Sequence, residues 1–344
     1  MAFVGIDHST TAIRVAIMGK GKGAQTLEFP KTDAPTSFMT FLGQKIAPMN
    51  IEMIAIAYSM GDSISAITPI LKLRDRGVRS LEGIGHHTGV GTRIFDEIRA
   101  SGLPAVAIPG LHRGCKWLDP RFTVLQSHLA APKKVAASFH CFSKLSEKRK
   151  VRNIVVANVS SNTVTVLIRD GRIVGAVDAA LGAPGLRHGP LDVEAIRRID
   201  RKELTANEAF STAGILKSPY DTVEKLFNAI RAKDKKAALL LESLIMAVAM
   251  EVGSLITVSG GVDAVALTGG LGEVRTPVNI GARLASYLGR KVEMFSRFSA
   301  AMGAAEMARL VKQGAKEIVG VPSVLEQENR RWAQSTGTRA GGRK

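Results

Sequence analysis

The sequence predicts an α/β protein of two domains, each built on a mixed sheet whose first strands form hairpins. The chain has 344 residues, which is more than one small core needs and is typical of two domains. Strand and helix patterns alternate along most of its length. In addition, a strand, a polar turn, a strand, a glycine turn and a strand occur in this order near residue 3 and again near residue 154. This recurrence indicates a duplicated architecture without a duplicated sequence.

The first half opens with a strand over residues 3–6, a hydroxyl-rich turn over 7–11 and an alternating strand over 13–17. Glycines at positions 19, 21 and 23 favour a second hairpin turn. The elements expected after this turn are a strand over 26–29, a helix over 33–48, a buried strand over 51–58, a strand over 103–108 and a charged inter-domain connection over 143–152.

The second half repeats the opening pattern. Its first expected elements are a strand over residues 153–157, a polar turn over 158–162, a strand over 163–168, an Asp-Gly turn at 170–171 and a strand over 173–176. Helical patterns then dominate residues 191–257. A strand over 264–267, a glycine turn over 268–273 and a terminal helix over 297–311 follow. The Gly-, Ser- and Arg-containing tail over 330–344 has the composition of a disordered segment.

The composition excludes several classes of protein. Hydrophobic residues make up 45% and charged residues 22%, which excludes wholesale disorder and fibrous repeats. The first apolar run reaches Asp7 too early for a secretory signal. The most apolar later stretch, residues 237–258, contains Glu242 and Glu251, which favours a buried core helix over a membrane span. We therefore expect a cytoplasmic protein that has no membrane partner.

The two cysteines, Cys115 and Cys141, cannot build a disulfide framework and are expected to be buried thiols in a reducing compartment. The net charge of +17 favours anionic partners such as nucleotides, nucleic acids or acidic proteins. Aromatic residues are only 5% of the chain, and no RNP-like, KH-like or zinc-knuckle pattern combines them with basic residues. A generally basic surface is thus favoured over a nucleic-acid-binding protein.

Three turns have the composition of phosphate-binding turns. Backbone N–H groups and hydroxyls in a tight turn donate to phosphate oxygens, and a nearby carboxylate can hold Mg²⁺ through water. Glycines after a strand let a ligand approach the backbone. Each turn alone is also typical of an ordinary structural turn, but their order and separation favour a nucleotide site. The candidates are Asp7, Ser9, Thr10 and Thr11 in the first turn, Ser160, Ser161 and Asn162 in the second, and Gly269, Gly270 and Gly272 in the third.

These segments resemble the actin-like ATPase superfamily, which includes acetate and butyrate kinases, Hsp70 and sugar kinases. Residues 5–11 resemble the first phosphate loop of the superfamily, and residues 154–172 resemble the second phosphate hairpin of the acetokinases. Residues 182–192 resemble a segment with a phosphate-contacting arginine, here Arg187. Residues 211–216 and 261–273 resemble the approach to the adenosine-binding turn, and Gln126-Ser127-His128 falls where these kinases have an active-site histidine. Within the superfamily, the Phe-Val-Gly-Ile-Asp-His opening is similar to that of the methanogenesis marker protein 12 family of methanogenic archaea.

The resemblance implies two actin-like (ribonuclease H-like) domains with a nucleotide cleft between them. The expected boundaries are residues 1–150, 151–325 and, for a basic tail, 326–344. It also implies ATP and Mg²⁺ as cofactors, an unknown small-molecule or protein partner, a possible homodimer and a link to methane-forming metabolism. The residues implied in catalysis are Asp7, which would also hold Mg²⁺ through water, His128 and Arg187. Glu273 would join the glycine turn in binding the nucleotide.

The sequence departs from acetate kinase at several places. The second phosphate turn of acetate kinase is glycine-rich, whereas here it is Val159-Ser160-Ser161-Asn162. The substrate-binding arginine of its Gly-His-Arg segment corresponds to His87, and His86-His87 lacks a third ligand for a metal. Residues 104–112 contain no carboxylate, so Asp119 is the nearest candidate for the catalytic aspartate. The late metal-binding glutamate has no counterpart near residues 297–303.

These departures leave two hypotheses for the function. The first is an ATP-dependent phosphotransferase or ATPase, which would depend on positioning and on neutralising phosphate charge. The second is a non-catalytic binding or assembly factor that keeps the nucleotide-binding fold and has lost the transfer chemistry. Acetate is a poor candidate for the substrate, and nucleotide binding is less affected by the departures than catalysis is.

Overall fold

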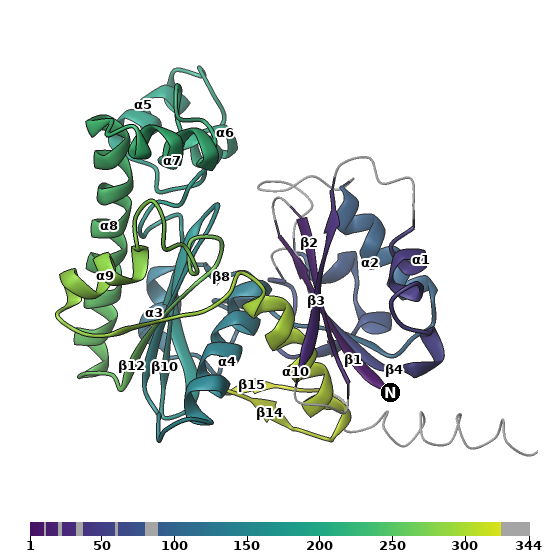
Figure 1. The fold of residues 1–344 in the computed structure, drawn as a ribbon. Helices are drawn as coiled ribbons and strands as arrows, with labels where there is room; N and C mark the ends of the chain where they lie inside the picture. The colour runs from purple at the N-terminus through teal and green to yellow at the C-terminus, as the bar shows by residue number, and fades with distance from the viewer. Residues whose placement is uncertain (10–11, 20–22, 32–36, 59–60, 80–88, 325–344) are drawn as a thin grey trace, which may run out of the picture.

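The computed structural model describes residues 1–9, 12–19, 23–31, 37–58, 61–79 and 89–324. Within this part, the chain forms two mixed β-sheets, and helices lie between them and on their outer faces (Figure 1). Four residues singled out in the sequence, Thr10, Thr11, His86 and His87, lie outside the described residues, as does the basic tail.

The N-terminal sheet has the strand order β3-β2-β1-β4-β6-β5. Its first three strands are antiparallel, and β4 and β6 continue the sheet parallel to β1. The strands are β1 (Ala2–His8), β2 (Ala12–Met18), β3 (Ala24–Pro30), β4 (Ile51–Ala57), β5 (Thr68–Pro69) and β6 (Ala105–Ala107).

The C-terminal sheet repeats this plan in the order β11-β10-β9-β12-β13. Three antiparallel strands are again followed by strands parallel to the first. Asp170 and Gly171 both have positive φ, as a tight hairpin turn requires. The predicted duplication is confirmed by strands β9 (Ile154–Val159), β10 (Thr163–Arg169), β11 (Arg172–Val177), β12 (Ala264–Thr268) and β13 (Val292–Met294).

Helices α1 (Phe38–Gly43) and α2 (Val90–Ala100) cover one face of the N-terminal sheet, where Ile6, Ile54 and Phe95 share a core. The helix expected over residues 33–48 is shorter in the described part. It ends at Gly43, and a 3-10 turn follows at Pro48–Asn50, because glycine weakens a helix and proline restricts the residue before it.

The other face of the N-terminal sheet contacts α10 (Ser299–Lys312), the last helix among the described residues. Helix α10 lies between β1 and α4 (Pro132–Ser146), and both helices occupy the space between the two sheets (Figure 1). Two glycines allow this close packing. A Cβ on Gly5 would lie 2.0 Å from the Ala301 carbonyl oxygen, and a Cβ on Gly303 would lie 1.9 Å from that of Ala136. Strand β1 and helix α10 are therefore packed together, although almost three hundred residues separate them.

Helix α4 extends to Ser146, so only the later part of the charged stretch over 143–152 is a connection. The predicted helical region contains α5 (Val193–Asp200), α6 (Ala206–Thr212), α7 (Val223–Arg231) and α8 (Lys235–Ser259), and α9 (Ile280–Leu288) follows β12. Helix α8 is long and apolar enough to cross a membrane by length and composition alone. Nine of its residues are nevertheless buried within the protein, as in the core helix of a soluble domain. Shorter elements are α3 (Pro120–Leu125), β7 (Leu111–His112), β8 (His128–Ala130), β14 (Glu317–Ile318) and β15 (Val321–Pro322).

Candidate functional site

A small cavity lies where the ends of β1, β9 and β12 approach one another between the two sheets. Its volume is about 20 Å³, enough for a water molecule and too little for a nucleotide. Five residues predicted from the sequence line it, namely Asp7, Ser9, Ser160, Gly269 and Gly270. The other lining residues are Arg14, Lys133, Asn158, Thr268, Arg297 and Ala300. The structure thus brings the first, second and third predicted turns to one place.

Asp7 stands near the end of β1 and is only 3% exposed. Its Oδ2 lies 3.7 Å from Nη1 of Arg14, whereas its Oδ1 has no hydrogen-bond partner among the described residues. Burial raises the pKa of the Asp7 carboxyl, and the nearby cations Lys133 and Arg14 oppose this rise. A buried carboxylate oxygen without a donor is costly, so a ligand that supplies a donor or a hydrated cation would be stabilised there.

A row of alternating charges runs from Asp7 across the N-terminal sheet and over to the C-terminal domain. Cross-strand pairing places Arg14 opposite Asp7 and Glu28 opposite Arg14. Arg14 donates from Nε to Glu28 at 2.9 Å. Arg297, in the loop before α10, reaches Glu28 at 3.5 Å and Glu273 of the glycine turn at 3.7 Å. Both arginines of the cavity are therefore paired with carboxylates, and Arg297 links the two halves of the molecule.

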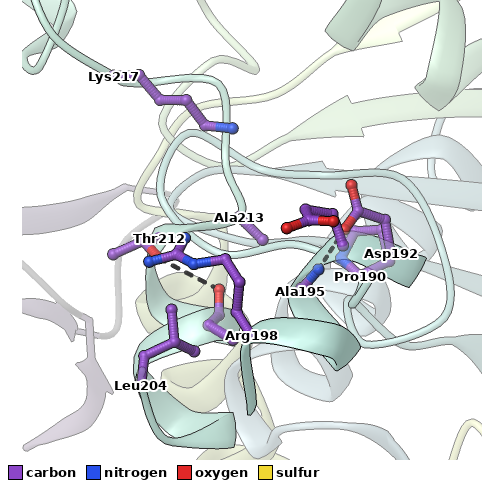
Figure 2. Close-up of a pocket in the computed structure, with 10 residues that line it drawn as sticks. Pro190, Asp192, Ala195, Arg198, Leu204, Thr212, Ala213 and Lys217 are labelled. Carbon is purple, nitrogen blue, oxygen red and sulfur yellow. Dashed lines mark hydrogen bonds between the residues drawn. The ribbon is translucent and has the colours of Figure 1, made fainter. Parts of the chain in front are cut away.

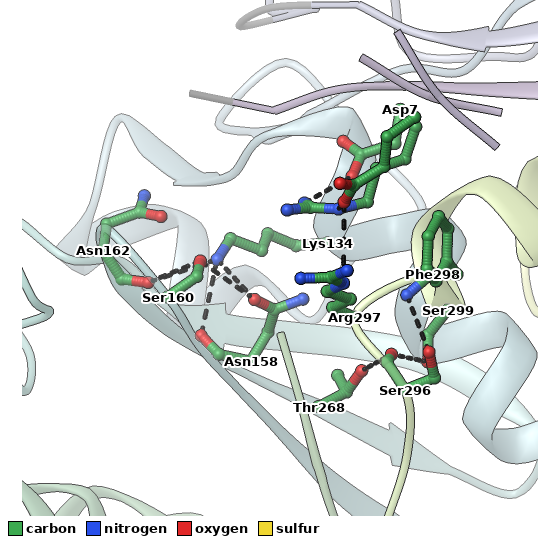
Figure 3. Close-up of polar contacts among 12 residues, drawn as sticks. Asp7, Lys134, Asn158, Ser160, Asn162, Thr268, Ser296, Arg297, Phe298 and Ser299 are labelled. Carbon is green, nitrogen blue, oxygen red and sulfur yellow. Dashed lines mark hydrogen bonds and ion pairs between the residues drawn. The ribbon is translucent and has the colours of Figure 1, made fainter. Parts of the chain in front are cut away.

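Lys134 holds the second predicted turn in place through hydrogen bonds from its ammonium group. This lysine is fully buried, and its Nζ donates to Asn158 Oδ1 at 2.9 Å and to the carbonyl oxygens of Asn158 and Asn162 at 3.4 Å each (Figure 3). Three acceptors match the three protons of an ammonium group. Burial lowers the pKa of Lys134 well below its usual range, and Lys133 adds to this effect. The Ser160 hydroxyl donates to Asn158 and Asn162 within the same turn.

Lys133 and Lys134 are functional candidates that the sequence analysis missed. Both stand in the first turn of α4, directly after Pro132, and the N-cap residue Ala131 provides no side-chain cap. A helix N-terminus carries partial positive charge and disfavours lysine. Two lysines directly after the proline that starts a helix therefore break a local rule, and residues that do so are often functional. This pattern is the sequence signal by which the two lysines could have been identified.

The glycine turn packs directly against the end of β9. Gly269 has a φ of 90°, and a Cβ there would lie 2.6 Å from the Val159 carbonyl oxygen. A Cβ on Gly272 would lie 2.4 Å from Cα of Thr268. These two glycines are required by the fold of the turn, whereas Gly270 has room for a side chain and lines the cavity.

The segment with Arg187 forms backbone hydrogen bonds with two other predicted segments. Leu186 donates to Ser160, Arg187 to Ser161, and Gly214 to Arg187. The segments around residues 160, 187 and 214 therefore lie side by side, as the resemblance implies. The Arg187 side chain is exposed and is not among the residues that line the cavity.

The remaining candidates lie away from the cavity. His128 is on β8, where its Nδ1 is 3.6 Å from Asp178 Oδ2. Asp119 caps α3 and forms an ion pair with Arg121 at 2.6 Å, and hydrogen bonds from Arg121 lower its pKa. Asp119 is therefore used structurally.

The carboxylate oxygen that faces the cavity fits a metal ion that is bound through water. Among the described residues, no group of three or more His, Cys, Asp or Glu side chains could bind a metal directly. The unpartnered Oδ1 of Asp7 could instead accept from water bound to Mg²⁺, which prefers oxygen ligands and keeps several waters.

A larger cavity of about 240 Å³ lies between α5 and α6 (Figure 2). Most of its polar side chains are already engaged in the local structure. Asp192 caps α5, and Arg198 pairs with Glu203 at 3.0 Å. These contacts maintain the helical subdomain, whereas Lys217, which also lines the cavity, has no ion pair among the described residues.

Solved structures with similar folds include several kinases. The propionate kinase of Francisella tularensis matches with a TM-score of 0.63 and 14% identity, covering 89% of this chain and 98% of that chain. The acetate kinase of Porphyromonas gingivalis matches with a TM-score of 0.59 and 12% identity, covering 90% and 99%. A ROK family glucokinase of Streptomyces griseus, in complex with glucose and AMPPNP, matches with a TM-score of 0.50 and 13% identity over 90% and 99%. The predicted two-domain actin-like α/β fold is confirmed.

Relatives of known sequence come from methanogenic archaea, although no family model matches the chain. The UPF0285 protein of Methanosarcina barkeri is 41% identical over 333 residues, covering 93% of this chain and 98% of its own length. That of Methanocaldococcus jannaschii is 40% identical over 329 residues, covering 93% and 98%. The relation to methanogenesis marker protein 12 stays a prediction, because these relatives have a different name. The chain belongs to the UPF0285 family.

Proposed function

We propose that this protein is an ATP-binding phosphotransferase of the acetokinase type, associated with methane-forming metabolism, with an acceptor still to be identified. The observation that carries the proposal is the convergence of Asp7, Ser160 and Gly270 on one cavity between the duplicated sheets. Asp7 and Asn158 stand at matching places near the ends of β1 and β9. The duplicated hairpins thus supply the two turns that would hold the phosphates.

In this proposal, the turns at Ser9–Thr11 and Ser160–Asn162 donate hydrogen bonds to phosphate oxygens. Gly269, Gly270 and Gly272 bring the backbone close to the adenosine, and Glu273 follows them. Asp7 orders the water around Mg²⁺, and when it is bound this ion neutralises phosphate charge. Arg187 would have to turn from its exposed position to contact a phosphate. His128 does not line the cavity, so it would have to influence the reaction through its neighbour Asp178.

The proposal is tested by titrating Mg-ATP calorimetrically into the wild type and into an Asp7→Asn variant. We expect the wild type to bind and the variant to lose Mg²⁺-dependent binding, because a neutral amide cannot order the hydrated cation. The melting temperature of the ligand-free variant should stay the same or rise, since a poorly partnered buried charge is removed. A variant that melts lower but keeps the full nucleotide-induced shift would make Asp7 a structural residue.

The second candidate is a nucleotide-dependent binding or assembly factor without transfer chemistry. It is favoured by the positions of the residues that transfer chemistry would need: Asp119 is used structurally, and Arg187 does not line the cavity. Such a protein would bind Mg-ATP and release no phosphate or ADP in the presence of small carboxylates. Phosphorylation of any small molecule that is lost in Arg187→Ala would exclude it.

We also propose that the partner of the folded chain is a second copy of itself. Three large apolar side chains on α8, Leu239, Met246 and Met250, are 66%, 45% and 68% exposed. Their spacings of seven and four residues place them on one stripe of the helix, as at a helix–helix seam. Light scattering of the full chain should give the mass of a dimer, and the mass of a monomer would contradict this proposal.

A further inference from the structure

Lys133 differs from the other cations of the cavity because its charge is not neutralised. Arg14 is paired with Glu28 and Asp7, and Arg297 with Glu28 and Glu273. For Lys133, no hydrogen bond or ion pair is found within the part of the chain that the structure describes. Its side chain is partly buried and lines the cavity together with Asp7 and Ser160.

The position of Lys133 is unfavourable for folding. It stands at the positive end of α4, next to the buried ammonium group of Lys134. Burial lowers the pKa of Lys133, and the nearby Arg14 adds to this effect. Asp7 is close enough to stabilise the charge of Lys133, yet its Oδ2 already faces Arg14. A lysine that is not paired in this environment is stabilised when an anion enters the cavity.

The anion must fit between Lys133 and the two predicted phosphate turns. Lys134 fixes the Asn158–Asn162 turn beneath the cavity, and Asp7 closes it from the N-terminal sheet with its unpartnered Oδ1 (Figure 3). The cation, the hydroxyl of Ser160 and the carboxylate thus approach one small volume from three elements. A tetrahedral oxyanion matches the two donors, Lys133 and the Ser160 hydroxyl, whereas the Asp7 carboxylate would hold the accompanying Mg²⁺ through water.

We propose that Lys133 binds the terminal phosphate of the nucleotide triphosphate, and that Lys134 is a positioning residue that holds the second phosphate turn in place. This proposal rests on the proposed nucleotide site and adds the residue that distinguishes a triphosphate from a diphosphate. The glycine turn and the outer parts of the cleft would bind ATP and ADP alike.

Calorimetric titrations with AMPPNP and with ADP, each with Mg²⁺, test this assignment in four versions of the full chain. Lys133→Met should weaken AMPPNP binding about 10- to 100-fold, the range for a hydrogen bond to a charged group, and change ADP binding by less than about twofold. Lys133→Arg should recover part of the loss, since the charge is kept. Lys148→Met, at an exposed lysine just beyond α4, is the matched control and should bind both nucleotides as the wild type does.

The outcomes separate this inference from the proposed function. If the wild type binds neither nucleotide, both the proposed function and the inference are wrong. If the wild type binds both and Lys133→Met weakens both equally or neither, only the role of Lys133 is wrong. Melting curves of each variant decide whether an equal loss comes from unfolding, which would also count against a specific phosphate contact.

Discussion

Glu251 is a buried carboxyl group, and burial destabilises its charged form. It is buried on α8, its Oε2 accepts a hydrogen bond from the Ala183 amide, and its Oε1 has no hydrogen-bond partner among the described residues. Burial raises the pKa of Glu251 to about 7. The contact lies at the start of the segment that leads to Arg187, so the protonation of Glu251 affects how firmly this segment is held.

This pKa shift predicts how stability depends on pH. The unfolded chain loses the Glu251 proton near its usual pKa of 4.5, whereas the folded chain keeps it to about pH 7. Between these values the folded state binds more protons, so stability falls as pH rises. Glu251→Gln imitates the protonated form and should match the wild type below pH 4.5. Above pH 7 it should have a free energy of unfolding about 3 kcal/mol higher than the wild type.

Chemical denaturation at pH 5 and pH 8 measures the difference. Glu242→Gln is the control on the same helix, because Glu242 is part-exposed and hydrogen bonds from Arg283 and Tyr287 lower its pKa. Its loss should reduce stability slightly at both pH values. An equal difference between Glu251→Gln and the wild type at pH 5 and pH 8 would contradict the raised pKa.

The sequence predicted the residues whose surroundings are local, and it missed those whose role depends on distant partners. Ser9, Ser160 and Gly270 could be found because a turn is defined by neighbouring residues. Lys134 could not be placed, since its acceptors Asn158 and Asn162 lie more than twenty residues away and become neighbours only when α4 packs under β9. In the same way, nothing local to Arg297 predicts its contact with Glu28 on the opposite sheet.

At the scale of elements, alternating patterns and turn residues were enough to predict most strands of the two sheets, but not the short strands β5 and β13 at their edges. The Asp170-Gly171 turn and strands β9 to β11 agree with the prediction closely, because hairpins depend on short-range sequence. The packing of α10 against β1 could not be predicted in this way. It depends on the absence of side chains at Gly5 and Gly303, which lie almost three hundred residues apart.

This packing gives a prediction about Gly5. A Cβ at this position would lie 2.0 Å from the Ala301 carbonyl oxygen and 2.2 Å from the Ala305 nitrogen, so Gly5→Ala must displace α10 or β1. We expect a loss of roughly 1–3 kcal/mol in the free energy of unfolding, as for an overpacked core. Because Asp7 follows two residues later on the same strand, nucleotide binding should weaken as well.

Gly19→Ala is the matched control for this substitution. No heavy atom lies within 4 Å of the position that its Cβ would occupy, so its stability should change by less than about 0.5 kcal/mol. Urea unfolding of the two variants compares them directly. If Gly5→Ala were as stable as Gly19→Ala, the close contact between the first strand and the last helix would be wrong.

At the scale of the whole molecule, the two halves are joined both by helices and by charges. Helices α4 and α10 lie between the sheets, and the row of ion pairs from Asp7 to Glu273 connects the N-terminal sheet with the glycine turn beside the cavity. A nucleotide cannot enter a cavity of about 20 Å³ without moving the halves apart. The ion pairs of Arg297 are the described contacts that such an opening must break at the edge of the cavity. Glu28 connects the two arginines, because it accepts a hydrogen bond from Arg14 and forms an ion pair with Arg297.

Glu28→Gln should therefore loosen this closure, because it removes one of the two carboxylate partners of each arginine. We expect faster association of a fluorescent ATP analogue in stopped-flow measurements, and tighter binding at equilibrium.

Part of any increase in the association rate would come from the added net positive charge, which attracts an anion over a long range. Glu52→Gln makes the same change in charge elsewhere on the N-terminal sheet, where Glu52 lies 3.9 Å from Lys312, and so measures that part alone. Long-range attraction is screened in 1 M salt, where the Debye length is about 3 Å, whereas a weakened closure persists. Glu28→Gln should thus still bind faster than Glu52→Gln in high salt, and equal rates for the two variants would show that Glu28 does not hold the cleft closed.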